Sequence, residues 1–468
     1  MYIFRLLNFL VVAFTFFNIA IITGDLFAEE YSLDDLYMIA LERSEQVGIS
    51  EQNTILAKRG KDKALSFLLP RVSTFGEYTQ YSEEKDASSN TGRFTIQPGS
   101  SSSWGVSIEQ SLSLGGREIT NFRISRKAIE SSEYDLYTTK EAYILRVAES
   151  FYDVLQASKS VDIAQENVKR LIKYRNDAKI RLQVGEVTKT ALLRAEAELS
   201  GAQSELIRTE NVLNLAKAVL ARIVGIEGDF DLKESTYTEN PSIGNTLFSD
   251  ELEPLYSLKV EAMRERSELK SNHIQKLIAE EQVRYAKGLY WPTLSVEGVY
   301  LKREEDPSSP FFNDESIYGT LRLEFPLFEG GLRRAEVREA EARKKQADLT
   351  YNDLRKKINV EVESAYLALK TQKGTLKSLE DQLEFARENY NAVSKQFTYG
   401  LADSIDVIDA NTLLLESERQ LNRAQYNYKL FLLVLKRATG TLLKEVVSQR
   451  SRVGSQDSGF VSKSQKAD

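Results

Sequence analysis

Few residue types in this chain are suited to covalent or metal chemistry. The sequence has no cysteine and one histidine, His273. The lack of cysteine excludes disulfides, thiol catalysis and zinc sites built on cysteine. His273 lies in the helix-like stretch SNHIQKL, and no second metal-binding side chain stands at ligand spacing from it. We interpret it as a helix-surface residue and expect neither a metal nor a cofactor.

Catalytic motifs are also missing. The stretch GVSIEQSLSLGG contains no nucleophile elbow, and no glycine-rich loop carries the lysine that holds a phosphate. The acidic pair Glu304-Glu305 falls in a predicted loop instead of a cleft. The sequence therefore predicts that the protein is not an enzyme.

Three aspartates form the most regular acidic group. Asp403, Asp406 and Asp409 follow Gly400 at spacings of three, so a helix would carry them on one face. Carboxylates gathered on one face attract cations. The plainer alternative is a solvated helix face whose negative charge compensates the positive end of the helix dipole.

Composition narrows the class of protein. The 468 residues include only 8 prolines and 24 glycines, and the stretches between them are rich in strong helix formers. The net charge is −7 with both signs interspersed, so no basic surface for nucleic acid is expected.

The N-terminus has the features of an export signal. Arg5 precedes an uncharged apolar run over Leu6–Ile22, and Ala28 offers a small-residue cleavage point. We expect a signal peptide over residues 1–28; an uncleaved membrane anchor is the alternative. No other segment is apolar enough for a spanning helix, so a membrane-embedded product would need β-strands.

The chain contains an internal duplication. Glycine landmarks recur 215 residues further along: Gly115 and Gly330, Gly185 and Gly400, Gly225 and Gly440. Upstream, LLPRVSTFGEY matches YWPTLSVEGVY with an offset of 222, from Pro70 to Pro292. Unequal loop lengths explain the difference of seven. The chain is two copies of one structural unit.

Each copy begins with a helix and continues with two strands. We expect helices over Leu33–Leu69 and Leu252–Leu289, each stopped by the following proline. Period-two alternation then predicts strand pairs within 71–114 and 293–327, joined by polar loops at Ser82–Ser103 and Glu304–Ser316. That makes four strands per chain.

Each copy ends in a long helical hairpin, predicted over 117–225 and 332–440. Spacings of four and three alternate along Ile358, Val362, Ala365, Leu369, Gln372, Leu376, Leu379 and Leu383, and only Gln372 among them is polar. A sustained period of 3.5 is typical of helices that wind around one another. At about 1.5 Å per residue, the longer arms would reach roughly 100 Å.

These predictions give the domain organisation. A signal peptide (1–28) precedes the first repeat (29–225), an equatorial linker (226–251), the second repeat (252–443) and a partly disordered tail (444–468). The fold class is mixed and predominantly α. Because four strands cannot close a barrel, closure would need several copies, and three copies would supply twelve strands. The sequence alone does not give that number. A non-pore coiled-coil structural or adhesin protein is the alternative.

The hairpin sequences resemble a known family. RLQVGEVTKTALLRAEAELSGAQSEL and QFTYGLADSIDVIDANTLLLESERQLNRAQYNYKLFLLVLKRATGTL resemble the tip hairpins of the TolC-like outer membrane efflux protein family. LSLGG and PLFEGG resemble its strand-to-helix junctions. The resemblance covers about residues 31–443. It implies a homotrimer with a twelve-stranded transmembrane β-barrel in the outer membrane of a diderm bacterium and a periplasmic α-barrel.

The resemblance also implies partners. A periplasmic adaptor, or membrane fusion protein, would dock at the hairpin tips and couple the duct to an inner-membrane transporter of RND, ABC or MFS type. Outer-membrane lipid would surround the barrel. The chain would then conduct substrates passively in a tripartite efflux or type I secretion system.

Site residues follow from the same resemblance. Asp406 and Asp409 match aspartates that constrict the tunnel in the family, with Asp403 beside them. Gly185 and Gly400 would form the tip turns and, with Thr190, Val187 and Leu401, border the adaptor contact. Two positions depart from the family pattern: Ala402 replaces a basic residue and Phe397 replaces a tyrosine. The usual polar links at the tip are therefore not carried over.

Overall fold

A computed structural model describes residues 29–89, 92–233, 252–308 and 313–448 of the chain. The expected signal peptide, most of the equatorial linker and the end of the tail lie outside these residues. The described residues form two compact units. Unit 1 comprises those of Met1–Arg43, Arg146–Glu251 and Leu376–Tyr426, and unit 2 comprises those of Ser44–Leu145, Leu252–Thr375 and Asn427–Asp468. Each unit therefore takes segments from both sequence repeats.

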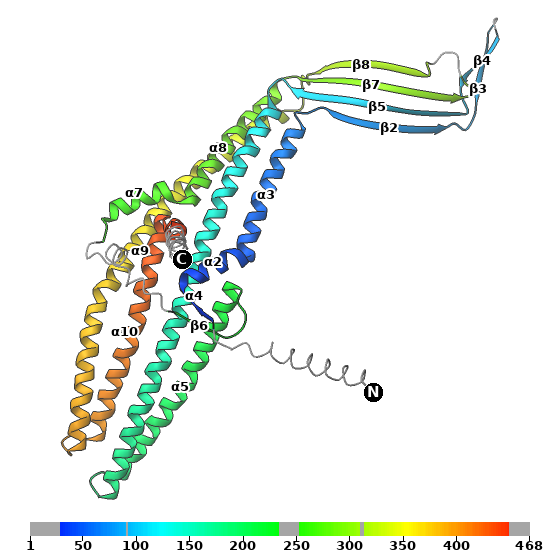
Figure 1. Cartoon of the computed structure of the whole chain (residues 1–468). Helices are drawn as coiled ribbons and strands as arrows, with labels where there is room; N and C mark the ends of the chain where they lie inside the picture. Colours follow the sequence, from blue (N-terminus) through cyan, green and yellow to red (C-terminus); the bar gives the residue numbers. More distant parts are fainter. Residues whose placement is uncertain (1–28, 90–91, 234–251, 309–312, 449–468) are drawn as a thin grey trace, which may run out of the picture. The chain divides into compact units, whose positions relative to one another are not determined.

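Unit 2 carries an antiparallel four-stranded sheet (Figure 1). Its order is β2-β5-β7-β8, with bounds β2 (Arg71–Gln80), β5 (Ser100–Ser113), β7 (Thr293–Asp306) and β8 (Glu315–Glu324). Two hairpins, β2–β5 and β7–β8, join through the β5–β7 pair. The four alternating stretches predicted from the sequence all lie in this sheet, and β2 and β8 form its edges.

The predicted polar loop Ser82–Ser103 is wrong in part. It contains a second hairpin, β3 (Lys85–Ser89) and β4 (Gly92–Gln97), and β5 already begins at Ser100. β3 is polar apart from Ala87, and in β4 only Phe94 and Ile96 alternate with polar residues, which is too short a pattern to mark a strand by periodicity. Cross-strand pairing stabilises them instead, including a 3.0 Å hydrogen bond from the Thr95 hydroxyl to Asp86.

The first helix of each repeat is also interrupted, which corrects the predicted helices Leu33–Leu69 and Leu252–Leu289. The observed segments are α2 (Leu33–Arg43), α3 (Glu45–Ser66), α7 (Leu255–Glu265) and α8 (Ser267–Lys287). Ser44 ends the first run because its extended backbone and hydroxyl cap α3, accepting from the Val47 N–H at 3.2 Å. Arg266 ends the other run, also with extended backbone, and the short helix η1 (Gly288–Tyr290) leads to Pro292.

The long hairpins are confirmed as helices. They are α4 (Arg117–Gln183) with α5 (Lys189–Val224), and α9 (Leu332–Thr398) with α10 (Ser404–Thr439). Seam residues are fully buried in unit 2: Ile358, Val362 and Leu369 are 0% exposed. Among the residues that the structure describes, no helix is both long and apolar enough to cross a membrane.

Each unit has its own core. In unit 1, residues of α4, α5, α9 and α10 pack together, including Leu171, Tyr174, Ala178, Ala195, Leu199, Phe397 and Val407. In unit 2, residues of α7 and α8 pack on α9 and α10, including Leu258, Ala262, Leu269, Ile358, Val362 and Leu435. A parallel strand pair that the sequence did not reveal, β1 (Glu29–Tyr31) with β6 (Phe230–Leu232), completes unit 1.

Candidate functional site at the hairpin ends and on the sheet

The turn between α4 and α5 depends on Gly185. Its φ of +80° lies in the left-handed region, where a side chain is strained. The Gly185 N–H donates to the Leu182 carbonyl at 3.1 Å, and the Glu186 N–H donates to the Arg181 carbonyl at 2.9 Å. These bonds satisfy carbonyls at the end of α4, so the predicted turn role of Gly185 has a direct physical cause.

The start of α5 separates the other residues predicted for this turn. Thr188 is the N-cap, and its hydroxyl accepts from the Ala191 N–H at 3.3 Å. Thr190 is the second helical residue and is exposed, while Val187 packs against the unit 1 core. The residue predicted for this turn was Thr190, whereas the cap is Thr188, although a threonine just before a helical run is a common N-cap signal.

The turn between α9 and α10 repeats this design. Gly400 has φ +76°, and the Leu401 N–H donates to the Gln396 carbonyl at 2.8 Å. The side chain of Leu401 is 79% exposed. Asp403 caps α10, and since 188 plus 215 is 403, it occupies the position of Thr188 in the first copy. The duplication therefore extends to the caps.

The three predicted aspartates are not equivalent. The Asp403 carboxylate accepts from the N–H groups of Ile405 (2.7 Å) and Asp406 (3.0 Å), while the Asp403 N–H donates to the Asp406 carboxylate at 2.9 Å. The backbone donor of Asp406 holds the pKa of Asp403 below its usual value. Asp403 thus precedes α10 instead of sharing its face. Asp409 lies one turn beyond Asp406, and all three aspartates are exposed.

A contact between the two turns was not visible in the sequence. Arg181, in the last turn of α4, donates a hydrogen bond to the carbonyl oxygen of Phe397 in α9. Its guanidinium also lies 4.7 Å from the centroid of the Phe397 ring and 2.9 Å from the Glu186 carboxylate. The ring of Tyr174 also packs against the Phe397 ring, with centroids 5.3 Å apart, and the Tyr174 hydroxyl donates to the Ser404 carbonyl. Arg181 therefore links the last turn of α4 to the last turn of α9.

A polar ladder joins α4 to α10 further from the turns. Arg170 forms a two-pronged ion pair with Glu418, with N–O distances of 2.9 and 3.2 Å. Its Nε donates to Asn411, which in turn donates to buried Asn167 at 2.9 Å. The side chains of the pair are only 17% and 14% exposed. Such buried polar groups fix the register of neighbouring helices because any shift leaves them unpaired. A polar stripe at spacings of seven and four, from Asn411 through Glu418 to Asn422, was the available sequence signal.

The sheet of unit 2 has two chemically different faces. On its apolar face lie Val72, Tyr78, Trp104, Val106, Ile108, Leu112, Leu294, Val296, Tyr300, Leu321 and Leu323, which the strand registers align. Trp104 and Tyr300 meet there edge to face at 5.7 Å. The opposite, polar face carries mainly serines and charged residues, with hydroxyl contacts between Ser73 and Ser107 and between Ser295 and Ser111. One face suits lipid and the other suits water.

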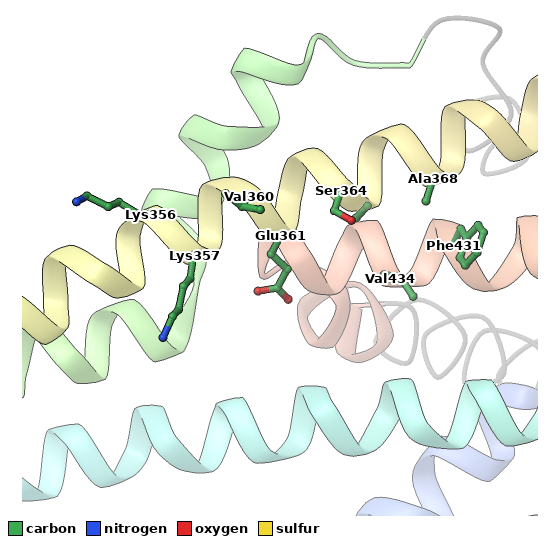
Figure 2. Close-up of a pocket in the computed structure, with 9 residues that line it drawn as sticks. Lys356, Lys357, Val360, Glu361, Ser364, Ala368, Phe431 and Val434 are labelled. Atoms are coloured by element: carbon green, nitrogen blue, oxygen red, sulfur yellow. The ribbon is translucent and has the colours of Figure 1, made fainter.

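A groove of about 780 Å³ lies between α9 and α10 in unit 2 (Figure 2). Its lining is largely apolar, with Val360, Ala365, Ala368, Phe431 and Val434, and two lysines lie toward one end: Lys356 and Lys357. The one carboxylate in the lining, Glu361, is held by Arg266 and Arg437. The lining offers no free acid–base pair. In the part of the chain that the structure describes, no three His, Cys, Asp or Glu residues are grouped to hold a metal.

Comparisons with known proteins agree with this geometry. The sequence model of the family described as "Outer membrane efflux protein" matches residues 36–226 and 258–441. The outer membrane protein TolC of Vibrio cholerae serotype O1 is 23% identical over 427 residues, covering 89% of this chain and 92% of that protein. The alkaline protease secretion protein AprF of Pseudomonas aeruginosa is 22% identical over 446 residues, covering 91% and 86%.

Solved structures show the same fold. The structure of CusC superposes with a TM-score of 0.76 at 17% identity and covers 88% of this chain and 93% of that chain. The outer membrane protein VceC of Vibrio cholerae gives a TM-score of 0.72 at 16% identity, covering 87% and 96%. Since the family model matches most of the sequence, in both repeats, the chain belongs to the outer membrane efflux protein family.

Proposed function

We propose that three copies of this chain form one water-filled exit duct, through which substrates delivered by another machine pass without catalysis. The observation that carries the proposal is the four-stranded sheet, which has one apolar face, one polar face and two unpaired edges, β2 and β8. Unpaired backbone groups at a sheet edge are costly in lipid. Three such sheets, joined edge to edge, supply twelve strands and remove every edge.

Family membership supports the general part of this function directly. The chain is an outer-membrane channel protein of efflux or secretion systems and extends into the periplasm. Its polar sheet face would line the water-filled interior and its apolar face would contact lipid. The paired helical hairpins would continue the wall into the periplasm. The division into leader, two repeats, linker and tail is part of the proposal.

The hairpin ends are the proposed docking surface for a periplasmic adaptor. Large apolar side chains flank both turns in the single chain: Val184 is 66% exposed, Tyr399 80% and Leu401 79%. Exposed apolar residues around a defined turn are typical of protein contacts. Gly185, Val187, Thr190 and Gly400 belong to the same surface. An inner-membrane transporter would complete the assembly, and its class (RND, ABC or MFS) decides the cargo.

Asp406 and Asp409 are the proposed selectivity ring. Three copies would place six carboxylates around the entrance, where their mutual repulsion favours bound cations. The capping bonds of Asp403 commit that residue to the start of α10. We therefore assign the ring to Asp406 and Asp409 and a positioning role to Asp403.

Planar-bilayer recording tests the proposal. Protein extracted from outer membranes with detergent should insert into a lipid bilayer and give discrete, cation-selective current steps. Heat-unfolded protein from the same preparation is the control for detergent leaks. Protein that folds and binds lipid but never conducts would favour the other class of function, an exported coiled-coil structural or adhesin protein.

A further inference from the structure

The two edge strands of the sheet are candidates for pairing with a second copy of the chain. β2 and β8 each have a partner on one side only. They lie at opposite edges of one sheet, so they cannot pair with each other inside one chain. Pairing between copies rests on the proposed assembly. The internal duplication supplies the register of that strand pairing.

The duplication preserves strand register to the residue. In the first hairpin, Arg71 pairs with Glu109. The offset of 222 carries residue 71 to 293, and the offset of 215 carries residue 109 to 324. The structure pairs Thr293 with Glu324. At the other end, Tyr78 pairs with Ser102, and the shifted residues Tyr300 and Ile317 also pair. The offsets found in the sequence therefore transfer a register from one copy to the other.

The β5–β7 pair is the junction between the two copies, and it pairs Ser107 with Val299. The equivalent junction on the other side would join the second strand of copy two, β8, to the first strand of copy one, β2. Shifting both residues, 107 plus 215 is 322 and 299 minus 222 is 77. We infer that β8 of one copy pairs antiparallel with β2 of the next, with Arg322 opposite Glu77.

The residues that this register brings together are complementary, although their chemistry was not used to derive it. The pairs are Leu323 with Gly76, Arg322 with Glu77, Leu321 with Tyr78, Thr320 with Thr79, and Tyr318 with Tyr81. Opposite charges and threonine pairs directly across strands stabilise a sheet. In the described part of the chain, neither Arg322 nor Glu77 has an ion pair; the Glu77 carboxylate accepts a long hydrogen bond, 3.4 Å, from the Thr79 hydroxyl on the same strand.

Alternative registers lose this match. A slip by one residue would set Arg322, on the polar face, opposite Gly76 or Tyr78, on the apolar face. A slip by two residues keeps the faces but sets Arg322 opposite Phe75 or Thr79. Two residues after Glu324 the chain contains Pro326, which has no N–H to donate. We therefore limit the hydrogen-bonded pairing between copies to Tyr318–Glu324 against Phe75–Tyr81.

A second observation supports the same arrangement. In the first copy, a Cβ added to Gly115 would lie 2.6 Å from the carbonyl oxygen of Gly288, so the two glycines are in close contact. The counterpart Gly330 has no atom within 4 Å of such a Cβ. The counterpart of Gly288 is Ser66, because 288 minus 222 is 66. In the inferred ring, Ser66 of the next copy lies at the open side of Gly330.

Disulfide trapping tests the register, and the chain has no cysteine of its own to interfere. The in-register variants are Thr79→Cys with Thr320→Cys, and Tyr78→Cys with Leu321→Cys. Neighbouring pairs alternate between hydrogen-bonded and non-hydrogen-bonded positions, so the two variants sample both geometries. The matched control is Glu77→Cys with Thr320→Cys, which is shifted by two residues on the same face. Directly opposed Cβ atoms lie about 5 Å apart and diagonal ones about 7–8 Å apart, which limits disulfide formation to the in-register pairs.

After mild oxidation in membranes, the in-register variants should run as covalent trimers on non-reducing gels and return to monomers with reductant. The control and each single-cysteine variant should stay monomeric on the same gel. Trapping of the control in place of the in-register pairs would overturn the register, as would an absence of trapping in protein that still conducts. Protein that stays monomeric before oxidation and does not conduct would overturn the proposed channel instead.

Discussion

The guanidinium of Arg181 lies 4.7 Å from the centre of the Phe397 ring and donates a hydrogen bond to the carbonyl oxygen of the same residue. This single side chain connects the last turn of α4 to the last turn of α9. The side chain of Arg181 is 13% exposed, so the contact is largely shielded from water. Phe397 lacks the hydroxyl of a tyrosine, but its ring and carbonyl serve the contact.

Removing this connection should loosen the hairpin ends. Arg181→Ala removes a cation–π contact and a hydrogen bond, together about 1–2 kcal/mol. We expect larger and noisier single-channel currents in planar bilayers. Arg175→Ala is the matched control, since Arg175 also lies on α4 but donates its hydrogen bond to neighbouring Asn176. Equal currents for Arg181→Ala and the unchanged protein would contradict a role at the entrance.

The acidic ring makes a separate prediction. Replacing Asp406 and Asp409 together by alanine should reduce the preference for cations over anions, because the carboxylates that attract cations are gone. The reversal potential under a salt gradient measures that preference. Asp403→Asn is the control, since asparagine also caps helices well and should leave selectivity unchanged. Unchanged selectivity in the double variant would reject the ring and leave the helix-dipole explanation.

The pair of Arg170 and Glu418 predicts a difference in stability. Arg170→Ala leaves a nearly buried carboxylate without its partner and should cost about 3 kcal/mol in the free energy of unfolding. Lys169→Ala, one residue away, removes only the exposed pair with Glu166 and should leave the free energy of unfolding almost unchanged, because solvent screens that pair. Denaturant titration of the detergent-solubilised protein compares them. Similar midpoints for the two variants would contradict the structural role of the ladder.

Glu265 gives a prediction about acid stability. A hydrogen bond from Lys444 lowers the pKa of Glu265 to about 2. A depressed folded-state pKa contributes stability that is present above the ordinary value of 4.5 and is lost as the pH falls toward 2. Lys444→Ala should therefore flatten the loss of stability between these two pH values.

The control for that titration is Lys345→Ala. Lys345 is exposed on α9 and, in the described chain, has no ion pair. Its variant should keep the steep decline of the denaturant midpoint between pH 4.5 and 2. An equally steep decline in Lys444→Ala would show that other carboxylates govern acid unfolding.

The sequence predicted the elements that follow from repetition and periodicity. The 215-residue glycine offset located both turns, Gly185 and Gly400, and the period-two alternation located the four strands of the main sheet. The same offsets also transfer the strand register, because the equivalent strands of the two copies align without insertions and the difference of seven residues falls in the loop between them. Local patterns of this kind depend only on neighbouring residues.

Other features depend on packing between distant segments and could not be predicted this way. Arg181 and Phe397 are separated by 216 residues, and no local pattern marks their contact. At the helix break the Arg266 backbone lies very close to Gly440, where an added Cβ would be 2.9 Å from the Arg266 nitrogen. The hairpin β3–β4 has only Ala87, Phe94 and Ile96 as apolar residues, so its periodic signal is too short to identify two strands.

One chain supplies four strands and cannot close a barrel, and we propose that three chains together do so. The mass of the protein part of the detergent-solubilised complex, measured by native mass spectrometry, tests it most directly. We predict three chains per complex, each of 53.1 kDa less the proposed leader over residues 1–28. A complex that holds a single chain under conditions in which the protein conducts would contradict it.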